Sequence, residues 1–296
     1  MVDTTPKTRE QWLEERLTGI GASESPTVLG RNPFQSRFAL WAEKTREATP
    51  RDLSDVEAVE FGRRFETPVA EVYGEKSGRL VEMWPAFSIV RDPERNHVFS
   101  TPDAVQLCKE RGEGLLQIKT AGEFKAKAWK YEPPLAYQIQ LQQELHCTGF
   151  EWGTLCVLIG GQRIRWFDIQ RNDRFIDAML PQLDRFWSMV QSKTPPEVDD
   201  SIATTEVLER LHRDDSGRMI FLPPEATGWT ADIEHANKLI RDAQRVKQLA
   251  TNRLKAAIGE ATYGLLPDGS EWSWKTENRR RRVVEAHTVR VLRKKR

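Results

Sequence analysis

Apolar residues along the first two thirds of the chain switch between helical and strand spacing. Apolar positions that recur every three or four residues predict helices at 8–17, 36–45, 55–78, 134–149 and 172–191. Residues 80–120 read as strands with turns at 91–96 and 109–114, and 152–170 read as a hairpin closed by Gly160 and Gly161. This order predicts an α/β fold in which helices pack on a mixed central sheet.

The last third of the chain has a different pattern. Prolines and charged residues at 194–228 indicate a linker, and a long helix follows at about 230–259. Its apolar positions repeat at heptad-like spacing, with Lys247 interrupting them: Ile233, Ala236, Ile240, Ala243, Ala250, Leu254 and Ala257. Such a helix either packs on its own domain or forms an arm that contacts another subunit or flanks DNA. We therefore expect a core at 1–195 and, at 196–296, an extension with this helix, a short β region and a basic tail.

Local signals refine two of the predicted helices. Thr8 with Gln11, and Ser54 with Glu57, have the spacing of capping boxes at helix starts. Pro68 lies inside the helix predicted at 55–78, where a proline kinks or splits a helix.

Composition limits the class of protein. Of the 296 residues, 39% are hydrophobic and 30% are charged, which indicates a globular chain. No apolar run approaches the ~20 residues of a membrane helix, and residues 1–12 lack the apolar core of a signal peptide. Three scattered cysteines fit a reducing cytoplasm, and no CxxC pair suggests structural zinc. We expect a cytoplasmic protein with no membrane partner.

Charge is unevenly distributed along the chain. The net charge is only +1, but the segment 279–296 is strongly basic. Such a segment either holds nucleic-acid phosphates through counterion release or is simply a solvated tail.

Two predicted strands bring candidate chemistry together. Asp103 follows a proline, which favours extended backbone, and Gln117 and Lys119 share one face of the strand "GLLQIK" because side chains alternate. An acid and a lysine on adjacent strands can hold Mg²⁺ and position a water for phosphodiester hydrolysis. The alternative is an ordinary cross-strand Asp–Lys ion pair.

The helix at 55–78 carries a second acid on a small and apolar face. Gly62, Glu66, Val69 and Tyr73 fall on that face, which directs Glu66 toward the sheet. A carboxylate there needs a metal or an ion pair, and Arg63 and Arg64 are the nearest arginines in sequence.

Two polar segments complete the candidate set. In "GIGASES", a serine at a glycine-rich helix start forms an anion site to which Arg16 can add a bidentate clamp, or it is only a cap. The segment "YQIQLQQEL" places Gln140 one turn before Glu144, and its glutamines are expected to form a solvated polar face.

Taken in order, these segments resemble the YqaJ-type viral recombinase and phage lambda exonuclease family, which has the PD-(D/E)XK nuclease fold. The matching stretches are "ERLTGIGASESPTVLGRNPF", "FGRRFETPVAEVYGEKSG", "STPDAV", "GLLQIKT" and "QLQQELHCTG". The resemblance implies a Mg²⁺-dependent 5′-to-3′ exonuclease, with Mn²⁺ able to substitute, that acts on ends of double-stranded DNA. It also implies 3′ overhangs for DNA recombination with a single-strand annealing protein, and a homo-oligomer such as a trimeric ring.

The resemblance assigns roles to particular residues. It implies metal ligation by Asp103, Gln117, the carbonyl of Ile118 and Glu66. It assigns the orientation or activation of the attacking water to Lys119.

Three further residues match the family pattern. Gln140 corresponds to the family's glutamine on the helix after the lysine strand, and Arg16 and Ser23 correspond to the groups that hold the 5′ phosphate. The implied catalytic set is thus Asp103, Gln117, Lys119, Glu66 and Gln140.

Gln117 departs from the family pattern, which has glutamate at this position. An amide keeps the shape and one carbonyl oxygen but loses the negative charge, so Mg²⁺ should bind more weakly. Three explanations remain: a deliberate replacement that stops cleavage, compensation by Glu144 or Glu66, or a DNA-end-binding protein that does not cut. The first is favoured because the other motifs are intact, and it gives a catalytically weakened enzyme.

Overall fold

The computed structural model describes residues 3–4, 8–50 and 56–278 of the chain. The chain divides into two compact units, Met1–Arg213 and Asp214–Arg296. The sequence placed this boundary after residue 195. Helix α7 (Ile202–Leu211) lies in the first unit because Val207 is buried and the Thr204 hydroxyl donates a 2.8 Å hydrogen bond to Ser36.

A five-stranded mixed sheet forms the centre of the first unit, in the order β3-β6-β7-β8-β9. Only β7 and β8 pair in parallel among these neighbours. The strands are β3 (Leu80–Met83), β6 (Ala104–Cys108), β7 (Gly112–Ala121), β8 (Trp152–Ile159) and β9 (Arg163–Gln170). The mixed α/β class predicted from the sequence is confirmed, and so is the β8–β9 hairpin.

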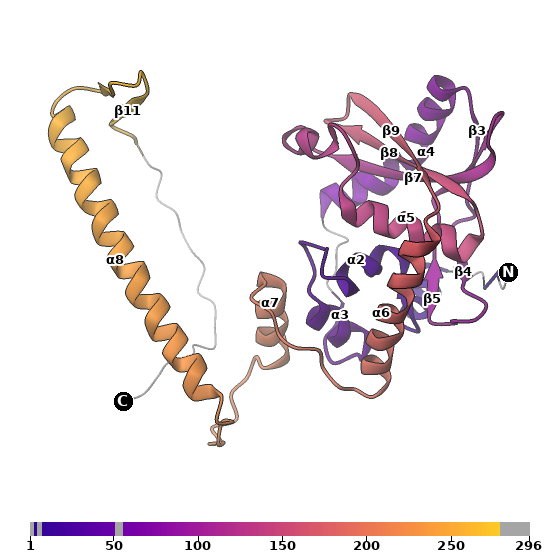
Figure 1. The fold of residues 1–296 in the computed structure, drawn as a ribbon, viewed down its shortest axis with the longest axis horizontal. Coiled ribbons are helices and arrows are strands. Elements are labelled where there is room, and N and C mark those ends of the chain that lie inside the picture. Colours follow the sequence, from indigo (N-terminus) through magenta and orange to yellow (C-terminus); the bar gives the residue numbers. More distant parts are fainter. Residues whose placement is uncertain (1–2, 5–7, 51–55, 279–296) are drawn as a thin grey trace. The chain divides into compact units, whose positions relative to one another are not determined.

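Two helices cover the opposite faces of this sheet (Figure 1). Helix α4 (Glu57–Ser77) packs Val69 and Tyr73 against Leu116 and Ile118. Helix α5 (Leu135–Thr148) packs its leucines against alternate strand positions, including Leu115. Because successive strand residues face opposite sides, both faces of β7 are buried and its side chains are divided between the two helices.

Helix α4 also tests the two local predictions made for it. It continues through Pro68 without interruption, so the proline does not split it. The helix begins after Val56, which makes no side-chain cap, and Ser54 of the expected capping box lies outside the described residues. At the first helix, the predicted capping box of Thr8 and Gln11 is confirmed.

A smaller four-stranded sheet, in the order β1-β4-β5-β2, lies on the other side of α5. Its strands are β1 (Asp3–Thr4), β2 (Ile20–Gly21), β4 (Ile89–Arg91) and β5 (Val98–Ser100). The remaining helices of this unit are α1 (Arg9–Arg16), η1 (Ala22–Glu24), α2 (Ser25–Val28), α3 (Arg37–Lys44), η2 (Glu123–Trp129) and α6 (Asp173–Gln191). Phe38, Leu183 and Phe186 belong to the apolar core shared by α3 and α6.

The described part of the second unit, up to residue 278, contains one long helix and a hairpin. Helix α8 runs from Ala226 to Ile258 and buries none of its side chains. Strands β10 (Tyr263–Leu265) and β11 (Glu271–Ser273) pair antiparallel, as the short β region predicted. The basic segment at 279–296 lies outside the described residues. None of the helices in the described part of the chain combines the length and apolarity needed to cross a membrane.

Candidate active site

Strands β6 and β7 bring Asp103 beside the residues predicted to work with it. Asp103 immediately precedes β6, whose first residue, Ala104, pairs with Leu116. The backbone N–H of Ile118 donates a 2.7 Å hydrogen bond to Asp103 Oδ2, and the Gln117 side chain donates another to the same carboxylate. The expected grouping of Asp103 with residues 117–119 is therefore present.

Gln117 is enclosed on the α5 side of the sheet. Its side chain is 3% exposed, and its Oε1 atom has no hydrogen-bond partner among the described residues. Leaving a buried carbonyl oxygen without a hydrogen-bond partner destabilises the folded state. The Gln117 side-chain oxygen is therefore positioned to bind a ligand such as a cation.

Helix α5 contributes a buried acid to the same place. Gln140 Nε2 donates a 2.8 Å hydrogen bond to Glu144 Oε1, whereas Glu144 Oε2 has no partner in the described part of the chain. Burial, and then the Asp103 carboxylate, raise the pKa of Glu144 to about 8, although Lys119 opposes the shift. Glu144 is thus a structural candidate for the carboxylate that Gln117 lacks.

The expected solvated glutamine face on α5 was wrong. Gln140, Gln142, Gln143 and Glu144 are all buried. Gln143 Nε2 donates to the carbonyls of Ile20 at 2.9 Å and of Phe99 at 2.8 Å. These amides satisfy backbone groups of the smaller sheet, because α5 is packed between the two sheets rather than on the surface.

Glu66 reaches the same group of charges from α4, the helix on the other face. Burial, and then the Asp103 carboxylate, raise the pKa of Glu66 to about 7, while Lys119 and Arg63 oppose the shift. The alternative ion pair does not form with Arg64, which instead contacts Glu60 at 2.6 Å.

Lys119 is the cation shared by these acids. It lowers the pKa of Asp103, Glu66 and Glu144 against the effect of burial. In the described part of the structure it makes no direct ion pair, and its ammonium lies 5.4 Å from the Tyr137 ring centroid. The simple cross-strand pair with Asp103 is therefore not what holds Lys119, which can interact with a third group.

These residues fit a divalent cation, with one carboxylate fewer than the family pattern. Burial raises the pKa of Asp103, and the Asp103 carboxylate raises the pKa of Glu66 and of Glu144, so these acids repel one another. Two oxygens of the same residue group, Gln117 Oε1 and Glu144 Oε2, have no partner among the described residues. A hard cation with oxygen ligands relieves both problems. No three His, Cys, Asp or Glu side chains of the described residues group closely enough to hold a metal by themselves. Amide and backbone oxygens would have to complete the ligand set.

The proposed phosphate residues form a second cluster. Arg16 Nη2 donates to the Ser23 hydroxyl at 3.3 Å and lies 3.4 Å from Glu24 Oε1. Glu24 also accepts from the Gly21 N–H at 2.8 Å and pairs with Lys44 at 2.7 Å. Burial opposes the charge of Glu24, but Lys44 and Arg16 outweigh it and its pKa is lowered.

Sequence reasoning missed Glu24 and Lys44, which fix this cluster. Lys44 Nζ also donates to the carbonyl of Arg16 at 2.6 Å, although the lysine is only 6% exposed. The only signal was a lysine ending the apolar stretch "FALWAEK". The expected helix start near Ser23 is a short 3₁₀ turn followed by the four-residue helix α2, so Arg16 rather than a helix dipole supplies positive charge.

The architecture defines the class of fold: the first unit is a mixed α/β core with helices on both faces of its five-stranded sheet. Two solved structures share its fold: an alkaline exonuclease, LHK-Exo, from Laribacter hongkongensis, and the same enzyme in complex with dAMP. They are 18% and 21% identical to this chain, with TM-scores of 0.51 and 0.53. They cover 62% and 68% of this chain, and 93% and 96% of their own chains are matched.

The sequence of the same unit is similar to a known domain family. Residues 11–151 match the model of the YqaJ-like viral recombinase domain. A relative, the uncharacterized protein YqaJ of Bacillus subtilis (strain 168), is 29% identical over 269 residues, covering 87% of this chain and 81% of the relative. Because the first unit ends at Arg213, a match to 87% of 296 residues extends into the second unit.

Proposed function

We propose that this chain is a metal-dependent deoxyribonuclease that digests linear double-stranded DNA from its 5′ ends and leaves 3′ overhangs. The observation that carries the proposal is the convergence of Asp103, Glu66 and Glu144 on one lysine, Lys119. The YqaJ-like domain match and the likeness of the fold to an alkaline exonuclease support it.

Each residue of the site has a separate role in this proposal. Asp103, Glu66, Gln117 and the Ile118 carbonyl hold Mg²⁺ or Mn²⁺, which when bound neutralises phosphate charge and lowers the pKa of a water ligand. Lys119 orients the attacking water and stabilises developing negative charge on the phosphate. Gln140 holds one Glu144 oxygen through its 2.8 Å hydrogen bond and leaves the other available to the site.

Gln117 makes this a weakened enzyme. Its amide donates to Asp103, which a carboxylate could not do, so one Asp103 lone pair is occupied without a metal. Glu144, which has a folded-state pKa of about 8, supplies a compensating negative charge once a bound cation displaces its proton, although it comes from a helix rather than from the strand.

The Arg16 cluster selects the end of the substrate. Arg16 and Ser23 bind the 5′ phosphate, while Glu24 and Lys44 hold Arg16 in place. The expected partners are DNA ends, a single-strand annealing protein and further copies of the chain in a ring-like oligomer.

A second candidate function is DNA-end binding without cleavage. The hydrogen bond between Gln117 and Asp103 favours it, because the pair is partly satisfied without a cation. The two candidates differ in whether the DNA survives.

The test uses linear duplexes that carry a 5′ phosphate at one end only, with each strand labelled differently. With Mg²⁺ we expect loss of the phosphorylated strand from its 5′ end and survival of its complement. Asp103→Asn should bind the same DNA and leave it intact. Loss of both strands, or equal digestion from a 5′-hydroxyl end, would overturn the assigned polarity and end site. Intact DNA under every divalent metal would favour the end-binding function.

A further inference from the structure

One face of helix α8 is polar and basic along most of its length. At 3.6 residues per turn, six polar side chains fall within a face about 100° wide. They are Lys238, Arg241, Arg245, Gln248, Asn252 and Lys255, called here the basic face. The apolar heptad positions lie outside this face and are centred on the opposite side of the helix.

Charge in this segment is strongly positive. Between residues 238 and 255 there are six lysines and arginines and one acid, Asp242, a net charge of +5 in a chain whose total is +1. Arg245 lies 3.9 Å from Asp242, and both side chains are more than half exposed. An exposed pair of that kind contributes little, so the arginine remains available to a stronger anion.

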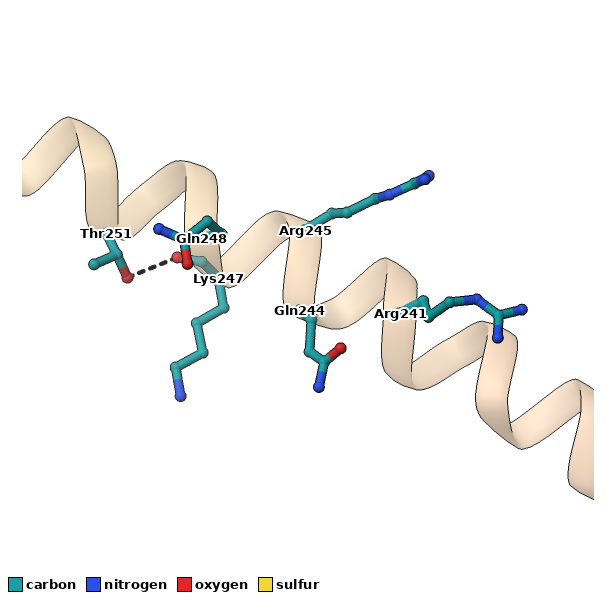
Figure 2. Close-up of a pocket in the computed structure, with 6 residues that line it drawn as sticks. All are labelled: Arg241, Gln244, Arg245, Lys247, Gln248 and Thr251. Carbon is teal, nitrogen blue, oxygen red and sulfur yellow. Dashed lines mark hydrogen bonds between the residues drawn. The ribbon is translucent and has the colours of Figure 1, made fainter. Parts of the chain in front are cut away.

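The shape of this surface excludes a small enclosed ligand. Figure 2 shows Arg241 and Arg245 extending from one side of the helix, while Lys247 extends from the other. Among the described residues, the shallow concavity here is lined by six side chains of this one helix: Arg241, Gln244, Arg245, Lys247, Gln248 and Thr251. A single helix cannot surround a ligand, but the ~26 Å between Lys238 and Lys255 suits an extended polyanion.

The hairpin that follows α8 adds exposed aromatic rings at one end of the basic face. Trp272 and Trp274 are 53% and 47% exposed, and they share one face of the hairpin because they are two residues apart. The Lys255 ammonium lies 5.4 Å from the Trp274 ring centroid, which joins the basic face to the aromatic rings. On the opposite hairpin face, Lys275 lies 4.6 Å from the Tyr263 ring centroid.

We propose that the basic face and the Trp272–Trp274 pair form a binding surface for single-stranded DNA. Phosphates contact the cations of α8, and unpaired bases stack on the two indole rings, which accept any base. The choice of DNA over RNA rests on the proposed function, whereas the surface itself is defined by the second unit alone. A surface of this kind could hold the strand that an exonuclease leaves behind.

The competing occupant is a second copy of this chain on the apolar side of α8. That side has heptad spacing but is interrupted by Lys247 and contains alanine at several core positions, which weakens a coiled coil. Neither Trp272 nor the basic face belongs to it. Substitutions on the basic face therefore test DNA binding, and substitutions on the apolar side of α8 test self-association.

The test measures binding of a short circular single-stranded DNA by fluorescence anisotropy, with the full chain in EDTA. A circle has no end for the Arg16 cluster, and without metal no cleavage occurs. Trp272→Ala/Trp274→Ala should weaken binding at least about fivefold. Arg241→Gln/Arg245→Gln should weaken binding and reduce the slope of log K against log salt by about 1.4.

The controls separate this proposal from the others. The exposed Glu113→Gln in the first unit should bind the circle normally, and because the assay uses neither metal nor a DNA end, failure of the nuclease proposal leaves this result unaffected. Ile233→Gln/Ile240→Gln should also bind normally, and circular dichroism should show unchanged helicity in all variants. The proposal is overturned if the tryptophan and arginine variants bind like the original chain. It is also overturned if only the isoleucine variant loses binding together with self-association, or if an RNA circle binds more tightly.

Discussion

The two units of this chain treat their polar residues in opposite ways. In the first unit, Gln117, Gln140, Gln143 and Glu144 are buried and directed by hydrogen bonds toward neighbouring strands and helices. In the second unit, no side chain of the 33-residue helix α8 is buried. Buried polar side chains lower the stability of the fold but are held in one orientation, as a reaction centre requires. Exposed polar side chains can change conformation, which suits the binding of a nucleic acid of any sequence.

The largest expected effect concerns Lys119, the shared cation of the buried site. Lys119→Ala should slow DNA digestion about a thousandfold, because the developing charge on the phosphate loses its partner. Digestion is best measured in the Gln117→Glu background, where the rate is highest. Lys109→Ala, in the exposed turn of the same β6–β7 hairpin, is the matched control and should cut normally. Equal rates for the two variants would mean that Lys119 has no role in the reaction.

The next effect concerns the stability cost of the buried acids. Glu144 has a folded-state pKa of about 8 against an ordinary 4.5, so the folded chain keeps a proton that the unfolded chain loses between these values. The free energy of unfolding therefore falls as pH rises through this window, and Glu66, with a pKa of about 7, acts in the same direction.

Glu144→Gln should remove much of this dependence. In EDTA at pH 8 we expect the variant to be more stable than the original chain by roughly 3 kcal/mol, with a much smaller difference at pH 5. Urea unfolding at the two pH values measures it, with the exposed Glu113→Gln as control. A Glu144→Gln variant that is less stable at pH 8 would contradict the repulsion among these acids.

A smaller effect is expected at the Arg16 cluster, which is only partly buried. Arg16→Lys keeps the charge but loses the two-pronged geometry, so preference for a 5′-phosphorylated end should fall about tenfold. The exposed Arg46→Lys, whose partner Glu14 is also exposed, should leave the preference unchanged. Competition between phosphorylated and hydroxyl ends in one reaction measures the ratio directly.

The smallest effect sharpens the contrast between the two long helices. Ala243→Gly in α8 should cost about 1 kcal/mol of local helix stability and leave the first unit unchanged. Ala70→Gly in α4 should cost more, since Ala70 is 3% exposed and packs on the sheet. Amide hydrogen exchange resolves the two helices separately. Faster exchange in the first unit after Ala243→Gly would show that the two units are energetically coupled.

Part of this architecture could be predicted because it depends on local spacing. Side-chain alternation was enough to place Gln117 and Lys119 on one face of β7, and Gly160–Gly161 was enough to predict the β8–β9 hairpin. The mixed α/β core followed from the order of these elements.

What could not be predicted depends on packing between segments distant in sequence. The glutamines of α5 are polar and looked solvated, but the helix is packed between two sheets, and the second sheet pairs β2 with β5 from residues nearly eighty positions apart. The Glu24–Lys44 pair likewise joins separate helical segments. Periodicity reports which residues share a face and not what covers that face.

The most direct test of the nuclease site compares the original chain with Gln117→Glu on 5′-phosphorylated linear duplex DNA and Mg²⁺, with Gln117→Glu/Asp103→Asn as the control. We predict slow digestion by the original chain, digestion on the order of a hundred times faster by Gln117→Glu, and none by the double variant. No digestion by Gln117→Glu under any divalent metal would contradict the account and leave a nuclease fold that binds DNA ends without cutting them.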